Sequence, residues 1–250
     1  MLLLVARVLL PRGRVRTVLL TLSALLGGIT VTMAASLLNS MLPDLLGLTP
    51  EAIGGEEAAY DVAAAFVGPT VEETLKLLAV LVVLGIGRPV LRGPMDGLAS
   101  GFFVGIGFAV VENVSYALTG ENGADPTVDS TWGMAESRLL LGFGDHALFT
   151  AISGAALAYA LVRGRRAWVW LPAGFATAVL MHIAWNGVSV SLDLLDAPEW
   201  AGYTVLIALY LGFVALFVAV RVRVGRVDRR LADARGAGVQ PVTSDAPGLR

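Results

Sequence analysis

Residues 94–118 read PMDGLASGFFVGIGFAVVENVSYAL, and the only charged residues among them are Asp96 and Glu112. A helix needs about 20 mostly apolar residues to cross the hydrocarbon core of a bilayer, and this stretch exceeds that length. Arg92 precedes the stretch and Glu121 follows it, so its two ends differ in charge. The stretch is therefore predicted to be a membrane-spanning helix with its ends on opposite sides.

The composition of the whole chain agrees with a membrane protein. Of its 250 residues 56% are hydrophobic and 15% are charged, and the mean hydropathy is +0.74. Soluble domains carry about 25% charged residues, so too little polar surface is available here to coat a soluble globule. The absence of Cys excludes disulfides, thiol nucleophiles and Cys-ligated metals. The net charge of −2 provides no overall attraction to nucleic acid, and no nucleic-acid partner is expected.

The fold class predicted from these patterns is an all-α, polytopic membrane helix bundle of about six spans. The expected spans are residues 17–38, 60–87, 94–118, 138–162, 167–191 and 200–220. The first is predicted to be a retained helix, because its apolar run is longer than the core of a typical signal peptide. We expect a transmembrane domain over residues 1–225, and a polar, disordered cytoplasmic tail over residues 226–250.

The loops between the expected spans alternate in charge. Every basic residue except Lys76 and Arg138 lies before the first span, after the last span, or between spans two and three or four and five. The other three loops contain acidic residues and neither Lys nor Arg. Because positive loops stay in the cytoplasm, both termini are predicted to be cytoplasmic in a multi-pass protein of the cell membrane.

Several ionisable residues fall inside the expected spans, where a charge at the helix centre costs about 2.5–3.5 kcal/mol and suggests a function. They are Glu72, Glu73, Asp96, Glu112, Asp145, His146 and His182. Measured from the outer side at 1.5 Å per residue, Glu112 should lie ~9 Å deep, the two histidines ~12–14 Å and Glu72 ~18 Å. Four helices thus bring a carboxylate or an imidazole to the outer half or the middle of the bilayer, which predicts one shared site.

Helical spacing adds detail to this site. Glu72 and Lys76 are four residues apart and share a helix face, whereas Glu73 points about 100° away. A purely structural ion pair, in which the charges of Glu72 and Lys76 cancel each other inside the membrane, would explain the presence of these two residues. It would leave Glu73 without a partner. His182 and Asn186 also share one face. In span three, Gly101 and Gly105 are expected to allow close helix packing.

Four motifs on successive spans resemble those of the PrsW family of intramembrane proteases, a distant relative of the CAAX-type prenyl endopeptidases. They are Glu72-Glu73-x-x-Lys76, Phe108-x-x-x-Glu112-Asn113, His146 with Gly154, and His182-x-x-x-Asn186. Lys76 and Glu112 replace the Arg and the His of the prenyl endopeptidase pattern, which favours PrsW. The resemblance covers residues 60–190.

The resemblance implies an intramembrane endopeptidase, often described as a metalloprotease, that cuts a membrane-anchored single-span protein such as an anti-sigma factor near the extracytoplasmic side. Glu72 or Glu73 is the candidate general base. Glu73, His146 and His182 are the candidate Zn²⁺ ligands, with Glu112 as a further candidate ligand and catalytic residue. Without a metal, the histidines would position the water and Asn186 would stabilise the oxyanion. Lys76 and Asn113 are expected to have supporting roles.

Two other classes of function remain open from the sequence. A proton- or cation-coupled transporter would use buried Glu and His residues as a relay, although no repeated halves are found in this chain. A non-catalytic scaffold or escort would use the same residues only to hold helices together, and would tolerate Glu→Gln and His→Asn changes. The sequence leaves open the substrate, the metal and the oligomeric state.

Overall fold

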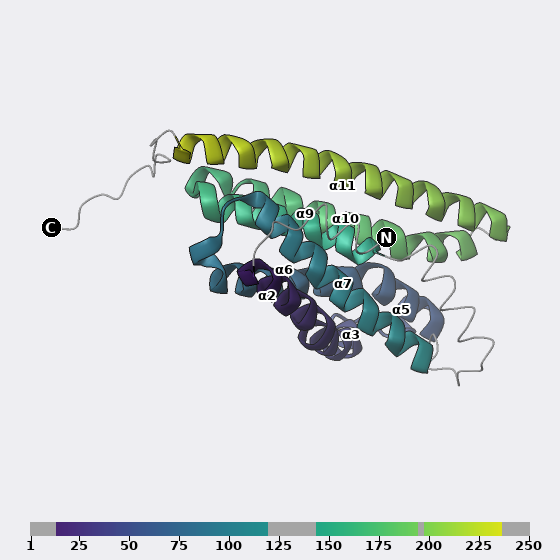
Figure 1. Cartoon of the computed structure of the whole chain (residues 1–250). Helices are drawn as coiled ribbons and strands as arrows, with labels where there is room; N and C mark the ends of the chain where they lie inside the picture. The colour runs from purple at the N-terminus through teal and green to yellow at the C-terminus, as the bar shows by residue number, and fades with distance from the viewer. Residues whose placement is uncertain (1–13, 120–143, 195–197, 237–250) are drawn as a thin grey trace.

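The computed structural model describes residues 14–119, 144–194 and 198–236. These residues form a bundle of helices without any strand in the described ranges (Figure 1). The predicted class, a polytopic helix bundle, is confirmed. Five helical stretches are long and apolar enough to cross a membrane: Thr17–Leu45, Pro94–Leu118, Asp145–Arg163, Arg165–Val188 and Trp200–Gly236.

The first two helical stretches each contain one π-helical turn. Helix α2 (Arg14–Leu25) continues through η1 (Leu26–Val31) into α3 (Thr32–Leu45). After the short α4 (Pro50–Ile53), helix α5 (Glu56–Val62) continues through η2 (Ala63–Val67) into α6 (Gly68–Ile86). The predicted span over residues 60–87 is thus helical, but it is not among the five stretches above, and its helix α6 carries three charged residues, Glu72, Glu73 and Lys76.

The remaining described helices follow in chain order. They are η3 (Arg88–Val90), α7 (Pro94–Thr119), α9 (Asp145–Arg163), η5 (Arg165–Ala167), α10 (Trp170–Leu194) and α11 (Glu199–Gly236). Gly144, with φ +99°, directly precedes α9, so the helix that carries His146 begins at Asp145, while residues 138–143 of the expected span lie outside the described residues. Helix α11 extends beyond the expected span to Gly236.

Helices α7 and α9 pack with their backbones in contact. A Cβ atom at Gly101 or Gly105 of α7 would collide with the carbonyl oxygen of Thr150 or His146 of α9. A Cβ at Gly97 would likewise collide with the carbonyl of Gly154. The predicted packing role of these glycines is confirmed, and the seam between α7 and α9 holds Glu112 and His146 at a fixed separation.

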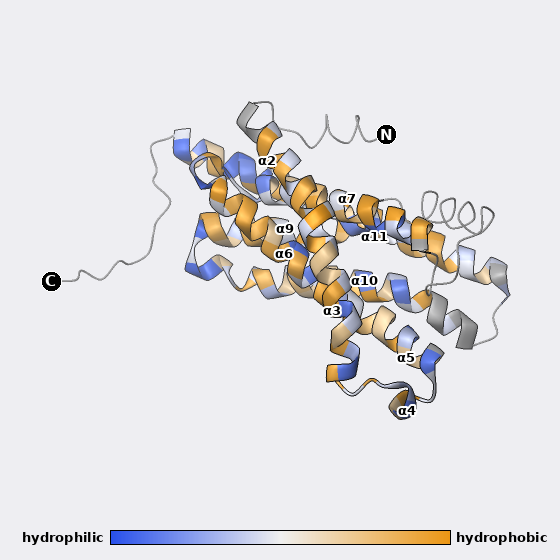
Figure 2. Cartoon of the chain, turned by 90° about the horizontal axis from the view of Figure 1, so that it is seen from below, coloured by the Kyte–Doolittle hydropathy of each residue, from blue (hydrophilic) through white to orange (hydrophobic). Residues whose placement is uncertain are grey.

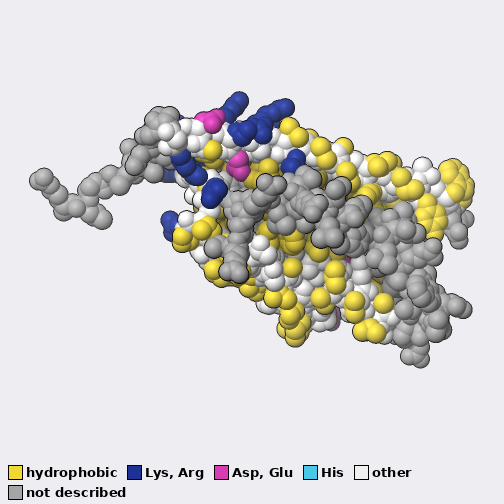
Figure 3. All heavy atoms as spheres, in the orientation of Figure 1, with side chains coloured by type: hydrophobic (Ala, Val, Ile, Leu, Met, Phe, Trp, Pro, Cys, Tyr) yellow, Lys and Arg dark blue, Asp and Glu magenta, His cyan; other side chains and the backbone are white. Residues whose placement is uncertain are grey.

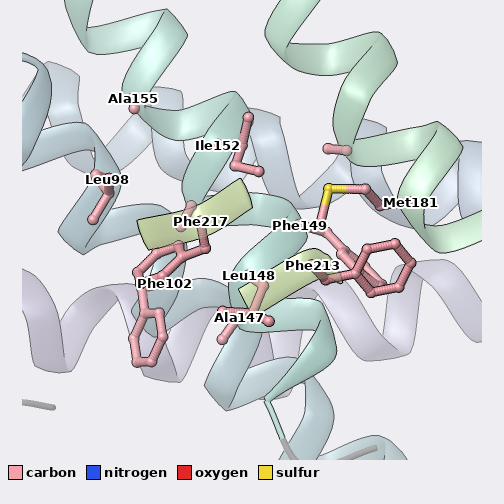
Figure 4. Packing of buried hydrophobic residues seen from close by; sticks show 12 residues of the cluster. Leu98, Phe102, Ala147, Leu148, Phe149, Ile152, Ala155, Met181, Phe213 and Phe217 are labelled. Atoms are coloured by element: carbon pink, nitrogen blue, oxygen red, sulfur yellow. The ribbon is translucent and has the colours of Figure 1, made fainter. Parts of the chain in front are cut away.

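Aromatic side chains fill the space between α7, α9, α10 and α11. Phe149 of α9 stacks edge to face on Phe213 of α11, with 5.3 Å between ring centroids. Phe102 of α7 contacts Phe217 of α11 in the same cluster (Figure 4). Because Phe149 also lies beside His182, with centroids 5.4 Å apart, this cluster forms one wall of the polar group described below.

Charged residues gather at one end of the bundle. Figure 2 shows apolar residues along the middle of α2, α6 and α7, and Figure 3 shows the Lys and Arg side chains grouped near the C-terminal end of α11. There Arg235 of α11 donates a hydrogen bond to the carbonyl oxygen of Arg92, which precedes α7 (2.9 Å). We call this the arginine-rich end of the bundle.

The close packing of α7 and α9 makes a testable prediction. Replacing Gly105 with Leu should lower the midpoint of thermal unfolding by about 5 °C, because overpacking costs about 1–3 kcal/mol. Gly85→Leu in α6 is the matched control, since a Cβ there meets no atom within 4 Å. Equal midpoints for the two variants, measured by thermal unfolding in detergent, would contradict the close packing.

Candidate active site

The candidate site draws on four helices. Near its start, α6 supplies Glu72, Glu73 and Lys76, while the later part of α7 supplies Glu112. His146 stands in the first turn of α9 and His182 at the middle of α10. Because α6 and α9 run towards the arginine-rich end and α7 and α10 run away from it, these positions lie at the middle of the bundle or in its opposite half.

Lys76 lies at the centre of the group and is fully buried. Its Nζ atom donates to Glu72 Oε2 at 3.2 Å and to Glu73 Oε1 at 3.0 Å, and lies 2.9 Å from His146 Nδ1. The ammonium group also stands 3.7 Å from the centre of the Phe108 ring, within cation–π range. Lys76 therefore pairs with both carboxylates, and the inference that an ion pair would leave Glu73 without a partner is wrong.

The two adjacent carboxylates differ in their surroundings. Both oxygens of Glu73 are engaged, one by Lys76 and the other by the hydroxyl of Thr150 at 3.0 Å, and its side chain is 0% exposed. Glu72 accepts a hydrogen bond from Asn39 Nδ2 at 3.3 Å, and its side chain remains 9% exposed. Glu72 is thus the carboxylate of the pair that a water molecule reaches more easily.

Glu112 orients His146. Its Oε2 atom lies 2.9 Å from His146 Nε2, and its side chain is 15% exposed. A neutral His146 that donates its Nε2–H to this carboxylate keeps the lone pair on Nδ1, directed towards Lys76 and Glu72. A carboxylate behind an imidazole is the arrangement that fixes the tautomer of metal-binding histidines.

One combination of side chains fits a metal ion. Glu72, His146 and His182 are buried and each offers a ligand atom, all within 4.8 Å of one another. His182 Nδ1 is buried without a hydrogen-bond partner, although it lies 3.3 Å from Glu73 Oε1. The formal charges also fit, since three carboxylates surround one ammonium and leave two negative charges that a divalent cation would balance. Glu73, the carboxylate predicted as ligand, is instead bound to Lys76 and Thr150.

Asn186 lies beside the backbone of η2. Its Nδ2 atom donates to the carbonyl oxygen of Ala64 at 3.0 Å. In this π-helical turn the N–H of Gly68 is bonded to Ala63, and Pro69 has no N–H to offer, so the Ala64 carbonyl lacks a helical partner. Asn186 satisfies it, which ties α10 to the turn that precedes Glu72.

Two other carboxylates that the sequence places inside spans bind backbone N–H groups at the start of their own helix. Asp96 accepts hydrogen bonds from the backbone N–H groups of Arg92 and Gly93 at the start of α7. Asp145 accepts one from the N–H of His146 at the start of α9, where the helix dipole favours a negative charge. Both residues lie in the first turn of their helix, and neither contributes a ligand atom to the group around Lys76.

Sequence reasoning missed two residues of the site. Asn39 of α3 and Thr150 of α9 each bind one of the adjacent glutamates. Thr150 could have been found, because it follows His146 by four residues and so shares its helix face. Asn39 lies outside all four motifs, and only its polarity within an apolar helix marks it. Asn113, predicted to support the site, is half-buried next to Glu112.

Comparison with known proteins identifies the family. The family model of PrsW family intramembrane metalloproteases matches residues 16–220. The chain belongs to the PrsW family. The resemblance drawn from the four motifs is therefore confirmed, and the match to the PrsW family extends beyond residues 60–190 into α2, α3 and α11.

A curated PrsW relative is also similar to this chain. It is the Protease PrsW of Geobacillus kaustophilus (strain HTA426), which is 30% identical over 155 residues. The aligned region covers 61% of this chain and 58% of that protein, so the chain spans less than two thirds of its relative's length. No solved structure matches the chain.

Proposed function

We propose that this chain is an intramembrane endopeptidase that hydrolyses a peptide bond in a membrane-anchored single-span protein. Membership of the PrsW family supports the reaction class. The observation that carries the proposal is the group formed by Glu72, His146 and His182, which come from three helices and lie buried beside Lys76. Carboxylate and imidazole groups are the side chains that most often move protons or bind metals in hydrolysis.

Within this proposal Glu72 is the carboxylate that contacts the reacting water. It retains some exposure and lies beside His182, with 3.8 Å between Oε2 and Nε2. Glu73 is a positioning residue, because it holds Lys76 and Thr150 and has no exposed surface. Glu112 keeps His146 in one tautomer. Asn186 positions the start of α6 through the backbone of η2 and is not assigned to the oxyanion.

The residues present fit a metal ion, and Glu72, His146 and His182 would hold it. A Zn²⁺ ion would act there as a Lewis acid and lower the pKa of its bound water. Lys76 Nζ now contacts both Glu72 and His146, so it would have to give up part of these contacts and keep its bond to Glu73. A role for Glu73 in holding Lys76 aside is consistent with its full burial.

Metal removal tests this assignment. The purified chain should contain about one equivalent of a divalent metal, and a chelator should abolish cleavage of a single-span reporter protein that the untreated chain cuts. Zn²⁺ should restore the cleavage. His182→Ala should lose the metal by elemental analysis, whereas Asn186→Ala should retain it, since Asn186 binds only a backbone carbonyl. Full activity of a metal-free chain would contradict the metal assignment while leaving Glu72 as the residue on the water.

We also propose that both termini are cytoplasmic and that the site lies nearer the extracytoplasmic side of the cell membrane. The arginine-rich end supports this orientation under the positive-inside rule. A reporter fused at Gly164, between α9 and α10, should then be cytoplasmic, and one fused at Gly123 extracytoplasmic. Position 123 lies outside the described residues. Reversed labelling would contradict the orientation and the predicted side of cleavage.

A further inference from the structure

A large cavity lies between α9, α10 and α11, apart from the candidate active site. Its volume is about 860 Å³, which falls in the range of about 300–1,000 Å³ typical of ligand pockets. Most of its lining is apolar, including Ile152 and Ala155 of α9, Ala173 of α10 and Ala219 of α11. None of the residues around Lys76 lines it.

One helix adds three positive charges to this cavity. Arg223, Arg226 and Arg230 of α11 all line it, and their spacing places them on one side of the helix. The three side chains are exposed. No carboxylate in the described part of the chain forms an ion pair with them. The cavity therefore offers three guanidinium groups that together favour an anion.

The polar and apolar parts of the lining follow one another along α11. On α11 the apolar lining residues Leu216, Ala219 and Val220 precede the arginines, which lie nearer the C-terminal end of this helix. Trp170, which begins α10, is also in the lining and is 53% exposed, as expected for an aromatic residue at the membrane interface. The cavity thus joins the interface to the hydrocarbon layer.

We propose that this cavity binds one anionic phospholipid, with the phosphate on the three arginines and the acyl chains against the apolar wall. A basic pocket between membrane helices is the kind of site that anionic lipid head groups occupy. The cavity is open to its surroundings, because Trp170 and the three arginines of its lining are exposed. A free phosphate ion would contact the arginines but leave the apolar lining uncovered. A phospholipid contacts both, the arginines with its phosphate and the apolar lining with its acyl chains.

Native mass spectrometry of the purified full-length chain tests the head-group contact. Dioleoylphosphatidylglycerol should be retained, and dioleoylphosphatidylcholine should bind much more weakly. The triple variant Arg223→Gln, Arg226→Gln, Arg230→Gln should bind phosphatidylglycerol about a hundredfold more weakly. The matched control is Arg163→Gln, Arg165→Gln, Arg166→Gln. It removes the same charge from exposed arginines outside the cavity and should bind within twofold of the unaltered chain.

A second pair of variants tests the apolar part without changing any charge. Ala219→Phe fills the cavity and should weaken phosphatidylglycerol binding at least tenfold, whereas Ala215→Phe, one turn earlier on α11 and outside the lining, should not. Excess inorganic phosphate should fail to displace the lipid. Equal binding of both lipids, or equal losses in a variant and its control, would overturn the proposal. So would a single-span peptide that cross-links at position 219 while phosphatidylglycerol is not retained, since the occupant would then be a protein.

Discussion

Replacing Glu72 with Gln is expected to lower the rate of reporter cleavage by at least a hundredfold. A positioned acid or base contributes about 10²–10⁴-fold to a reaction, and a metal-ligating carboxylate contributes no less. The amide keeps the shape of the side chain, and its one oxygen can still accept from Lys76, which binds Glu72 at 3.2 Å. Its NH2 group can donate to Asn39 Oδ1, which is buried without a partner, once the Asn39 amide turns over. The variant should therefore remain in the membrane with a thermal midpoint close to that of the unaltered chain.

The control for this measurement is Glu56→Gln, an exposed residue in the first turn of α5. It removes one carboxylate far from Lys76 and should leave cleavage unchanged. Glu73→Gln should also reduce cleavage, but through the position of Lys76, so its thermal midpoint should fall as well. An active Glu72→Gln variant would remove Glu72 from the reacting atoms, whereas a scaffold would show no cleavage even in the unaltered chain.

Lys76→Met is expected to have the largest effect on stability. It leaves Glu72 and Glu73 buried without their shared cation, and breaking a buried ion pair costs about 3–5 kcal/mol. For a chain of this length the midpoint of thermal unfolding should fall on the order of 10 °C. Expression in the membrane and a thermal melt in detergent measure the effect.

A second substitution distinguishes the two ion pairs of Lys76. Adding Glu73→Gln to Lys76→Met should restore more stability than adding Glu72→Gln, because Glu73 is 0% exposed and Glu72 is 9% exposed. Neutralising the deeper carboxylate removes the more costly buried charge. If neither double variant is better expressed than Lys76→Met alone, the role of Lys76 as their shared cation is refuted.

The sequence was sufficient to predict that the polar residues meet. A carboxylate or an imidazole inside a span must face protein or water. The side chains of Glu72, Glu112, His146 and His182 are therefore expected to face the interior of the bundle. The family motifs and the glycine pairs of α7 added to the same conclusion, and the structure brings these residues into one group.

The partners of the individual atoms could not be predicted in the same way. Helical spacing separates Glu72 from Glu73 by about 100°, but a lysine side chain is long enough to reach both from Lys76. The hydrogen bond of Asn186 depends on the π-helical turn Ala63–Val67, which leaves the Ala64 carbonyl without a helical partner. Pro69 in the sequence does not by itself predict that turn. The start of α9 depends on the backbone of Gly144, which no hydrophobic pattern reveals.

The glycine contacts between α7 and α9 also restrict how a substrate arrives. Carbonyl oxygens of α9 occupy the places where Cβ atoms of Gly97, Gly101 and Gly105 would lie, so another chain finds no gap between the two helices over these residues. Spreading them would separate Glu112 from His146 and so disturb the site that the substrate must reach. The path of a substrate segment from the lipid to Glu72 therefore lies on another side of the bundle.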